Sequence, residues 1–365
     1  MIMILCMHTL NLAVYNRSIW SYGSGYHLNI MSIPEVIIEL FSVIAVNLFG
    51  LISGYLMWQA KFKISRLVSL YLHTAFYSVS ITLLFFLFDT KTVSFSYWII
   101  SLLAITQYWY IKSYFALLCI IPILVVIVNY LKDRIVASII ALFFISFVST
   151  FIPGDMFCIH YGFTFVWLSV MFVIGGIIRA KESDINHEKT TLLTATIFIC
   201  SLAINILLYF FVRATLKQSF QNTLLFLLNS NYAAPLITIQ SISFFVLILR
   251  CKINNAITQR IIAFFGPLTL AVYLIHMQPL FMRYILENAL QNLIPFGRNA
   301  ISESQYSIIY LSEVGIIVFL FFSCCIIDYF RILLFRGLKI NIAIQKTDFF
   351  LSLLRNENST SKKNE

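Results

Sequence analysis

The sequence predicts an all-α fold: a polytopic integral membrane helical bundle of about ten transmembrane helices, with both termini cytoplasmic. Three observations predict this class. Of the 365 residues, 60% are hydrophobic and only 11% are charged, whereas a soluble domain carries roughly a quarter charged residues. The apolar residues are gathered in runs that are long enough to cross a bilayer as helices. Lys and Arg fall mostly on one side of these runs.

Each predicted span is an apolar run of about 17 to 25 residues, the first being somewhat shorter. The spans lie at 1–15, 36–58, 67–88, 108–131, 135–152, 162–178, 191–212, 233–250, 261–282 and 308–330. The run at 93–105 is shorter and interrupted, so we expect an interfacial or re-entrant segment there. The outer loops are too short for a globular domain. We therefore predict one transmembrane domain at 1–340 and a cytoplasmic tail at 341–365.

The positive charge of the chain follows the predicted topology. The net charge is +10, but the basic residues stand singly between apolar runs and form no stripe that would bind nucleic acid. With the N-terminus inside, most of the 25 Lys and Arg residues fall on the inner loops and the tail, as the positive-inside rule requires. The seven cysteines contain no C-x-x-C pair and have no histidine at ligand spacing. We therefore expect neither a disulfide framework nor a metal.

Polar residues inside the predicted spans are the candidate functional residues, because an ionisable group in hydrocarbon costs several kcal/mol unless it faces a cavity or a partner. His8 lies within MIMILCMHTLNL. Its imidazole suits a general base, and it equally suits a histidine that hydrogen bonds to a neighbouring helix or faces water. The other such residues are Glu39, His73, Lys112, His276 and Asp328, with Asn47, Asn129 and Asn205 as uncharged companions. Because Arg331 follows Asp328 on the same helix face, we expect a local ion pair there.

Two groups of charges border the second predicted span. Glu35 and Glu39 are four residues apart and share one helix face, so they fit a hydroxyl-rich acceptor, although solvated carboxylates are commoner. Lys61, Lys63 and Arg66 lie where the second span leads into the third. They fit the phosphates of a nucleotide-like donor, and they also fit positive-inside anchoring against phospholipid.

Aromatic residues bunch at the start of the predicted span at 108–131. Tyr108, Trp109, Tyr110 and Tyr114 are typical of an aromatic belt at a membrane interface. They would also form a platform on which a sugar ring stacks.

Four segments, in order along nearly the whole chain, resemble the bacterial membrane acyltransferase type 3 family, whose members O-acetylate polysaccharides. The most specific is VNLFGLISGYLMWQAKFKISRLVSLYLHTAFYS, with Ser53, Gly54 and Tyr55 in the S-G-Y/F element before a basic loop. The next two are YWYIKSYFALLCIIPILVVIVN, which ends at Asn129, and GFTFVWLSVMFVIGGIIRA. The last joins NYAAPLITIQSISFF to GPLTLAVYLIHMQPLF and places His276 in the Y-L-I-H element.

The resemblance implies a membrane acyltransferase with a cytoplasmic acyl-CoA donor, most often acetyl-CoA, and no permanently bound cofactor. The acceptor would be a sugar hydroxyl of a cell-surface polysaccharide or of its lipid-linked precursor at the inner or plasma membrane. His8 falls on the first-span histidine that the family uses in acyl transfer. The family's upstream basic residue would precede Met1, so we expect that either the first span is clipped or the enzyme is impaired. The resemblance assigns Lys63 and Arg66 to the CoA phosphates and Asn47, Ser53 and Tyr55 to the acyl path. His276 is a further candidate substrate contact, and so is Glu39, because its helical spacing from Glu35 places the two carboxylates on one face.

A transporter or flippase for a glycan or small molecule is the alternative function. It would be expected to show internal repeats and Gly or Pro breaks in paired spans, and the sequence shows no convincing repeat. A glycan polymerase would need a large outer loop, which the span pattern does not leave room for. Stabilisation by acetyl-CoA distinguishes the enzyme from the transporter.

Overall fold

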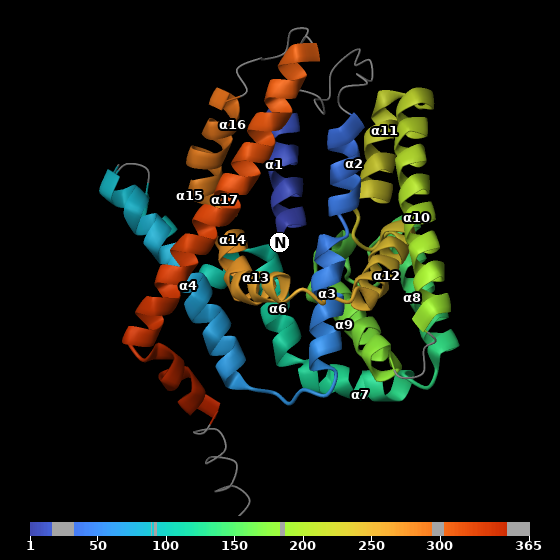
Figure 1. Cartoon of the computed structure of the whole chain (residues 1–365), viewed down its shortest axis with the longest axis horizontal. Coiled ribbons are helices and arrows are strands. Elements are labelled where there is room, and N and C mark those ends of the chain that lie inside the picture. The colour runs from blue at the N-terminus through green and yellow to red at the C-terminus, as the bar shows by residue number, and fades with distance from the viewer. Residues whose placement is uncertain (17–32, 89, 91–92, 183–186, 294–302, 349–365) are drawn as a thin grey trace, which may run out of the picture.

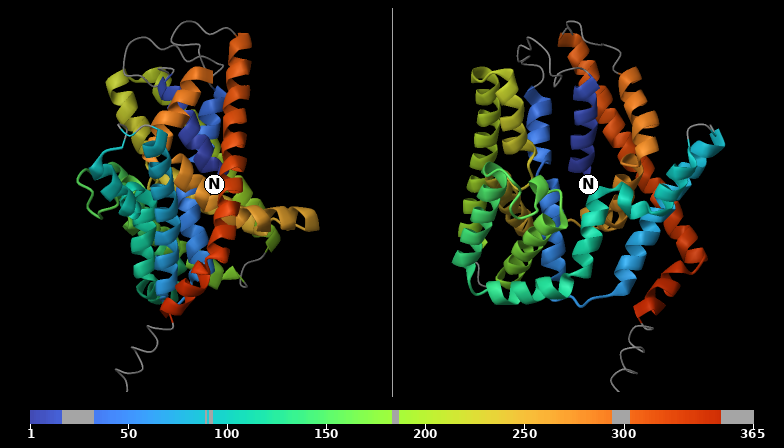
Figure 2. Two further views of the ribbon diagram at one scale, coloured as in Figure 1. Left: turned by 90° about the vertical axis from the view of Figure 1, so that its left-hand side faces the viewer. Right: turned by 180° about the vertical axis from the view of Figure 1, so that it is seen from behind.

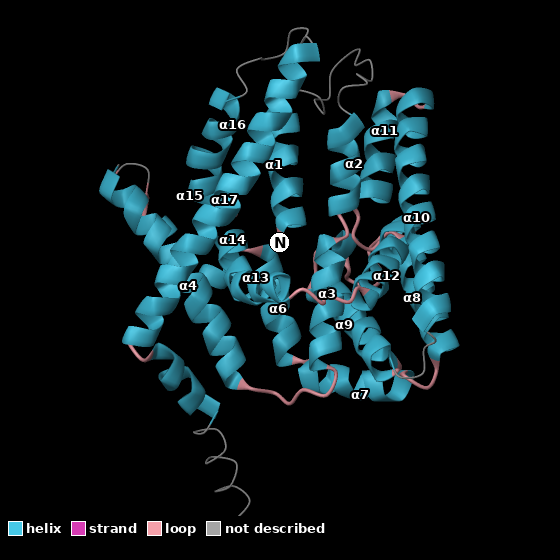
Figure 3. Ribbon diagram, viewed as in Figure 1, coloured by secondary structure: helices cyan, strands magenta, loops and turns pink. Residues whose placement is uncertain are grey.

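The structure of the chain, a computed structural model, describes all residues except 17–32, 89, 91–92, 183–186, 294–302 and 349–365. It confirms the all-α prediction, because 85% of the described residues are helical and none of them lies in a strand. Short connections join the helices (Figure 3).

The first half of the chain forms α1 (Ile2–Asn16), α2 (Ile33–Ser42), α3 (Ala45–Met57), α4 (Ile64–Phe88), α5 (Phe95–Leu102), η2 (Ala104–Gln107), α6 (Trp109–Cys119), α7 (Ile121–Leu131), α8 (Ile135–Phe151), η3 (His160–Gly162) and α9 (Phe165–Ala180). The second half forms α10 (His187–Thr215), α11 (Gln218–Leu225), η5 (Phe226–Ser230), α12 (Pro235–Arg250), α13 (Ala256–Phe265), η6 (Gly266–Leu268), α14 (Thr269–His276), α15 (Pro279–Phe281), η7 (Met282–Leu286), α16 (Glu287–Leu293) and α17 (Glu303–Gly337).

Six helical stretches in the described part of the chain are long and apolar enough to cross a membrane. They are Ile33–Met57, Ile64–Phe88, Thr190–Thr215, Thr223–Arg250, Ala256–His276 and Tyr310–Gly337. The bent pair of α6 and α7 is a seventh candidate, and α8 and α9 are shorter apolar helices. The chain is therefore a helical protein with several candidate membrane spans, and the predicted count of ten and the cytoplasmic termini stay predictions.

The run at 108–131, predicted as one span, is broken in the structure. α6 ends at Cys119 and α7 starts at Ile121, and the two helix axes differ by 71°. Pro122 lies in the first turn of α7, where its ring lacks an N–H and cannot continue the α6 hydrogen-bond ladder. α7 consequently runs across the lower end of the molecule (Figure 1).

Helices α3 and α9 form the closest contact in the core. A Cβ atom at Gly54 would lie 1.8 Å from the carbonyl oxygen of Phe172, and one at Gly175 would lie 2.1 Å from that of Leu51. Only glycine permits this approach of two helix backbones, and Gly50 with Gly54 forms the G-x-x-x-G spacing that membrane helices use for it. The contact fixes α3, which carries the residues that border the site described below.

The loops after α3, α7 and α9 all lie at the lower end of the molecule (Figure 1). They carry Lys61, Lys63, Lys132, Arg134 and Lys181. The Nζ atom of Lys181 donates to Oδ1 of Asp133 at 2.9 Å and links two of these loops. By contrast, α1 begins in the middle of the molecule and runs to its upper end (Figures 1 and 2).

Candidate active site

His8 and His276 meet inside the bundle, although 268 residues separate them in the chain. Nδ1 of His8 lies 2.9 Å from Nε2 of His276, and the ring centroids are 5.2 Å apart. His8 comes from α1 and is half-buried, whereas His276 is the last residue of α14 and is fully buried. The sequence singled out both histidines, and the structure adds that they form one hydrogen-bonded pair.

The hydrogen bonds of the pair determine which nitrogen carries each proton when both rings are neutral. Nδ1 of His276 lies 2.5 Å from the carbonyl oxygen of Val272. A carbonyl oxygen only accepts, so this nitrogen is the donor, and Nε2 of the same ring is left as an acceptor. The bond between the rings is then donated by Nδ1 of His8. Nε2 of His8 consequently has a free lone pair.

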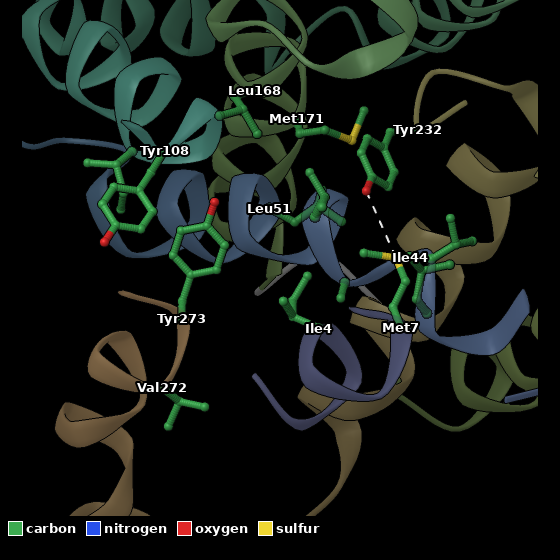
Figure 4. Packing of buried hydrophobic residues seen from close by; sticks show 14 of the residues in the cluster. Ile4, Met7, Ile44, Leu51, Tyr108, Leu168, Met171, Tyr232, Val272 and Tyr273 are labelled. Atoms are coloured by element: carbon green, nitrogen blue, oxygen red, sulfur yellow. Dashed lines mark hydrogen bonds between the residues drawn. The ribbon is translucent and has the colours of Figure 1, made fainter. Parts of the chain in front are cut away.

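His8 borders an apolar cavity of about 340 Å³, which we call the first cavity. α1, α3, α4, α6 and α14 supply its walls, together with Tyr232. Figure 4 shows Ile4 and Met7 of α1 opposite Tyr232, whose hydroxyl contacts the sulfur of Met7 at 3.9 Å. Tyr273 reaches in from α14 (Figure 4), and its buried hydroxyl has no hydrogen-bond partner among the described residues. The first cavity thus combines largely apolar walls with the imidazole of His8 and several hydroxyl groups, among them the unpartnered hydroxyl of Tyr273.

A second cavity of about 650 Å³ adjoins the first. The two cavities share Met57, Leu70, Tyr114 and Leu270 as wall residues. The second cavity is more polar, because Ser65, Arg66, Ser69 and His73 of α4 line it. A ligand that is long and polar at one end can therefore extend from Arg66 towards His8.

Arg66, one of the two predicted phosphate-binding residues, lines the second cavity, and Lys63 does not. Nη1 of Arg66 donates to the carbonyl oxygen of Lys61 at 3.0 Å. This bond folds the basic loop back against the start of α4.

Asp328 forms a buried network beside the second cavity. It accepts hydrogen bonds from Nε of Arg331 at 2.6 Å and from the hydroxyl of Tyr77 at 2.6 Å, and Nε2 of His73 lies 3.1 Å from the same carboxylate oxygen. The predicted ion pair with Arg331 is confirmed. Tyr77 was not predicted as a partner of Asp328, although it follows His73 by one helical turn.

Ser53 is the predicted acyl-path residue that the structure places on the first cavity. Asn47 is fully buried, but its amide is used elsewhere. It donates to the carbonyl oxygen of Tyr232 at 2.9 Å and to Ser241 at 3.1 Å, and it accepts from Trp167 at 2.8 Å. Asn47 thus joins α3, α9 and α12 and does not border either cavity.

Tyr55 and Glu39 also line neither cavity. The hydroxyl of Tyr55 donates to Glu182 at 2.8 Å and accepts from Arg179 at 3.0 Å. The hydrogen bonds from Tyr55 and from Arg179 hold the pKa of Glu182 below its usual range. Tyr55 therefore ties α3 to the end of α9, while Glu39 is half-buried on α2.

The aromatic group at 108–114 faces the interior. Trp109, Tyr110 and Tyr114 line the first cavity, and Tyr108 is buried, with its hydroxyl donating to the carbonyl oxygen of Leu274 at 2.9 Å. These side chains thus form a wall of the first cavity, and the stacking of a sugar on them stays a prediction.

Comparison with known proteins connects this site to one family. The model of the acyltransferase domain, acyltransferase type 3, matches residues 1–336. No curated protein and no solved structure matches the chain.

Proposed function

The chain belongs to the acyltransferase type 3 family, and from this premise we propose that it moves an acyl group, most simply acetyl, from acyl-CoA to a sugar hydroxyl. The acceptor we propose is a cell-surface polysaccharide or its lipid-linked precursor, and the location is the plasma membrane. Membrane acyltransferase activity is what the family and the apolar helices support directly. The observation that carries the finer proposal is the histidine pair, whose His8 borders an apolar cavity that adjoins a second cavity lined by Arg66.

His8 is the general base of the proposed reaction. Its Nε2 lone pair, left free by the bonds to His276 and Val272, takes the proton of the sugar hydroxyl as the oxygen attacks the thioester carbon. A C–O bond forms and the C–S bond breaks. The imidazolium then returns the proton to the departing thiolate, so atoms and charge balance.

Three other groups assist this step. The unused hydroxyl of Tyr273 is a donor for the negative charge that develops on the thioester oxygen, and such donors contribute strongly in sites from which water is excluded. His276 keeps the proton of His8 on Nδ1 and so is a positioning residue. Arg66 attracts the phosphates of the donor, since guanidinium groups bind phosphate in a bidentate way.

The experiment that tests the proposal compares two histidine variants. His8→Asn in purified protein, reconstituted with the glycan acceptor and radiolabelled acetyl-CoA, should lose transfer by about 10²- to 10⁴-fold, which is the range of general-base contributions. His160→Asn is the matched control, because His160 is exposed on the loop before α9 and should keep wild-type activity. Wild-type transfer by correctly inserted His8→Asn protein would exclude His8 as the base.

The transporter alternative is tested by donor binding. An acyltransferase that binds acetyl-CoA should show a higher Tm in its presence, because a ligand that binds only the folded state stabilises it. If acetyl-CoA leaves the Tm of the wild-type protein unchanged, the transporter function is favoured.

A further inference from the structure

The chain returns to the start of α4 after α17 has ended. It turns at Leu338 and Lys339, where Lys339 has a φ of 56°, and residues 340–348 form another helix. We call these nine residues the C-terminal segment. The family match ends at residue 336, so the C-terminal segment lies outside it.

Asp348 anchors the C-terminal segment to α4. Its carboxylate accepts from the backbone N–H of Ser65 at 3.0 Å and from the Ser65 hydroxyl at 2.6 Å. These two bonds, with a further contribution from Lys63, hold the pKa of Asp348 below its usual range. Ile344, one turn earlier, is buried. The segment is thus attached to the protein by a charged contact and by an apolar one.

The anchored segment forms a wall of the second cavity. Asn341, Ile344 and Gln345 line it, and their spacing places the three side chains on one helix face. Ser65, Arg66 and Ser69 of α4 line the same cavity. The tail predicted at 341–365 therefore begins with residues that border a cavity, and no motif in the sequence identifies them.

The chemistry of this wall suits neutral amides. A side-chain amide offers two N–H donors and one carbonyl acceptor, and neither Asn341 nor Gln345 forms a side-chain hydrogen bond to a described residue. The arm of coenzyme A between its phosphates and its sulfur contains two amide groups. With Arg66 holding a phosphate and the acyl group next to His8, that arm would pass through the second cavity.

We propose that Asn341 and Gln345 bind the amide-bearing arm of a phosphate-carrying acyl thioester, and that the Asp348–Ser65 contact holds this wall in place. The inference rests on the proposed function and extends the donor site beyond the family domain.

The test uses the full chain in detergent micelles and a double variant, Asn341→Leu with Gln345→Met. Both changes remove the amide and keep similar size. The Kd for acetyl-CoA should rise about tenfold, the expected loss for two hydrogen bonds of ordinary strength. In transfer assays the KM for acetyl-CoA should rise with it, while kcat stays within about twofold, because the arm is bound equally in the ground and transition states.

Ile342→Ser is the matched control. Ile342 belongs to the same helix, is 53% exposed and does not line the cavity. The Kd of this variant for acetyl-CoA should therefore equal that of the wild type. An unchanged Tm without ligand shows that the variants are folded. If the wild type binds acetyl-CoA and the double variant binds it equally well, the inference is wrong and the proposed function stands. If the wild type does not bind acetyl-CoA, both fail.

Asp348→Ala tests the anchor separately. Loss of the carboxylate should loosen the wall and raise the Kd for acetyl-CoA about threefold, in line with one weak bond. Tighter binding by this variant would mean that the carboxylate competes with the donor phosphates near Lys63, which contradicts its role as an anchor.

Discussion

His276 determines whether the lone pair of His8 faces the first cavity, so its acceptor nitrogen matters more than its bulk. His276→Gln retains an oxygen that accepts from Nδ1 of His8, whereas His276→Leu has similar size and no acceptor. We expect the leucine variant to lose about 10²- to 10⁴-fold in kcat, as when a base is left in the wrong tautomer, and the glutamine variant to lose much less. The KM for acetyl-CoA should be unchanged in both. Equal losses in kcat would show that orientation by an acceptor is not the role of His276.

The candidate site residues differ in how much of their role the sequence predicted. Both histidines were found from the sequence, because each stands within an apolar run where helix formation requires no imidazole. Their contact was not, because no local rule relates residues 268 positions apart. Asn47 and Tyr55 were expected on the acyl path from the family resemblance alone. The structure instead uses their polar groups to join helices, a role that motif spacing does not distinguish from substrate binding.

The contact between α3 and α9 depends on glycine at position 54. In Gly54→Ala the added methyl group would lie 1.8 Å from the carbonyl oxygen of Phe172, so the helices must separate and the cavity wall on α3 must move. We expect destabilisation by about 1–3 kcal/mol, typical of overpacking. Gly315→Ala in α17 is the control, because a Cβ there meets nothing within 4 Å and alanine favours the helix. Thermal unfolding in detergent should show a lower Tm for Gly54→Ala and an unchanged or higher Tm for Gly315→Ala. Equal shifts in Tm for the two variants would contradict the close contact.

Helix location was largely predictable and helix shape was not. Apolar runs located the stretches from α4 to α17, because burial in lipid requires long apolar helices. The break at Ile120 lies within an apolar run, so composition shows nothing there, although Pro122 was a local signal. The short α5, with 8 residues, agrees with the expectation that 93–105 is too short to cross. Whether a given apolar helix crosses the membrane depends on its tilt and neighbours, which sequence periodicity does not contain.

The whole molecule has a basic end, and its orientation in the membrane decides where the donor enters. The loops with Lys61 and Lys181 lie at the lower end, opposite the junction of α10 and α11 (Figure 1), and the positive-inside rule places such loops in the cytoplasm. We expect Ala214→Cys, next to that junction, to react with an impermeant maleimide on intact cells, and Lys61→Cys to react only after permeabilisation. The background is a functional variant with its seven cysteines replaced by alanine. The opposite labelling pattern would put Arg66 and the second cavity on the face away from cytoplasmic acyl-CoA, and a cytoplasmic donor could not then reach His8 by this route.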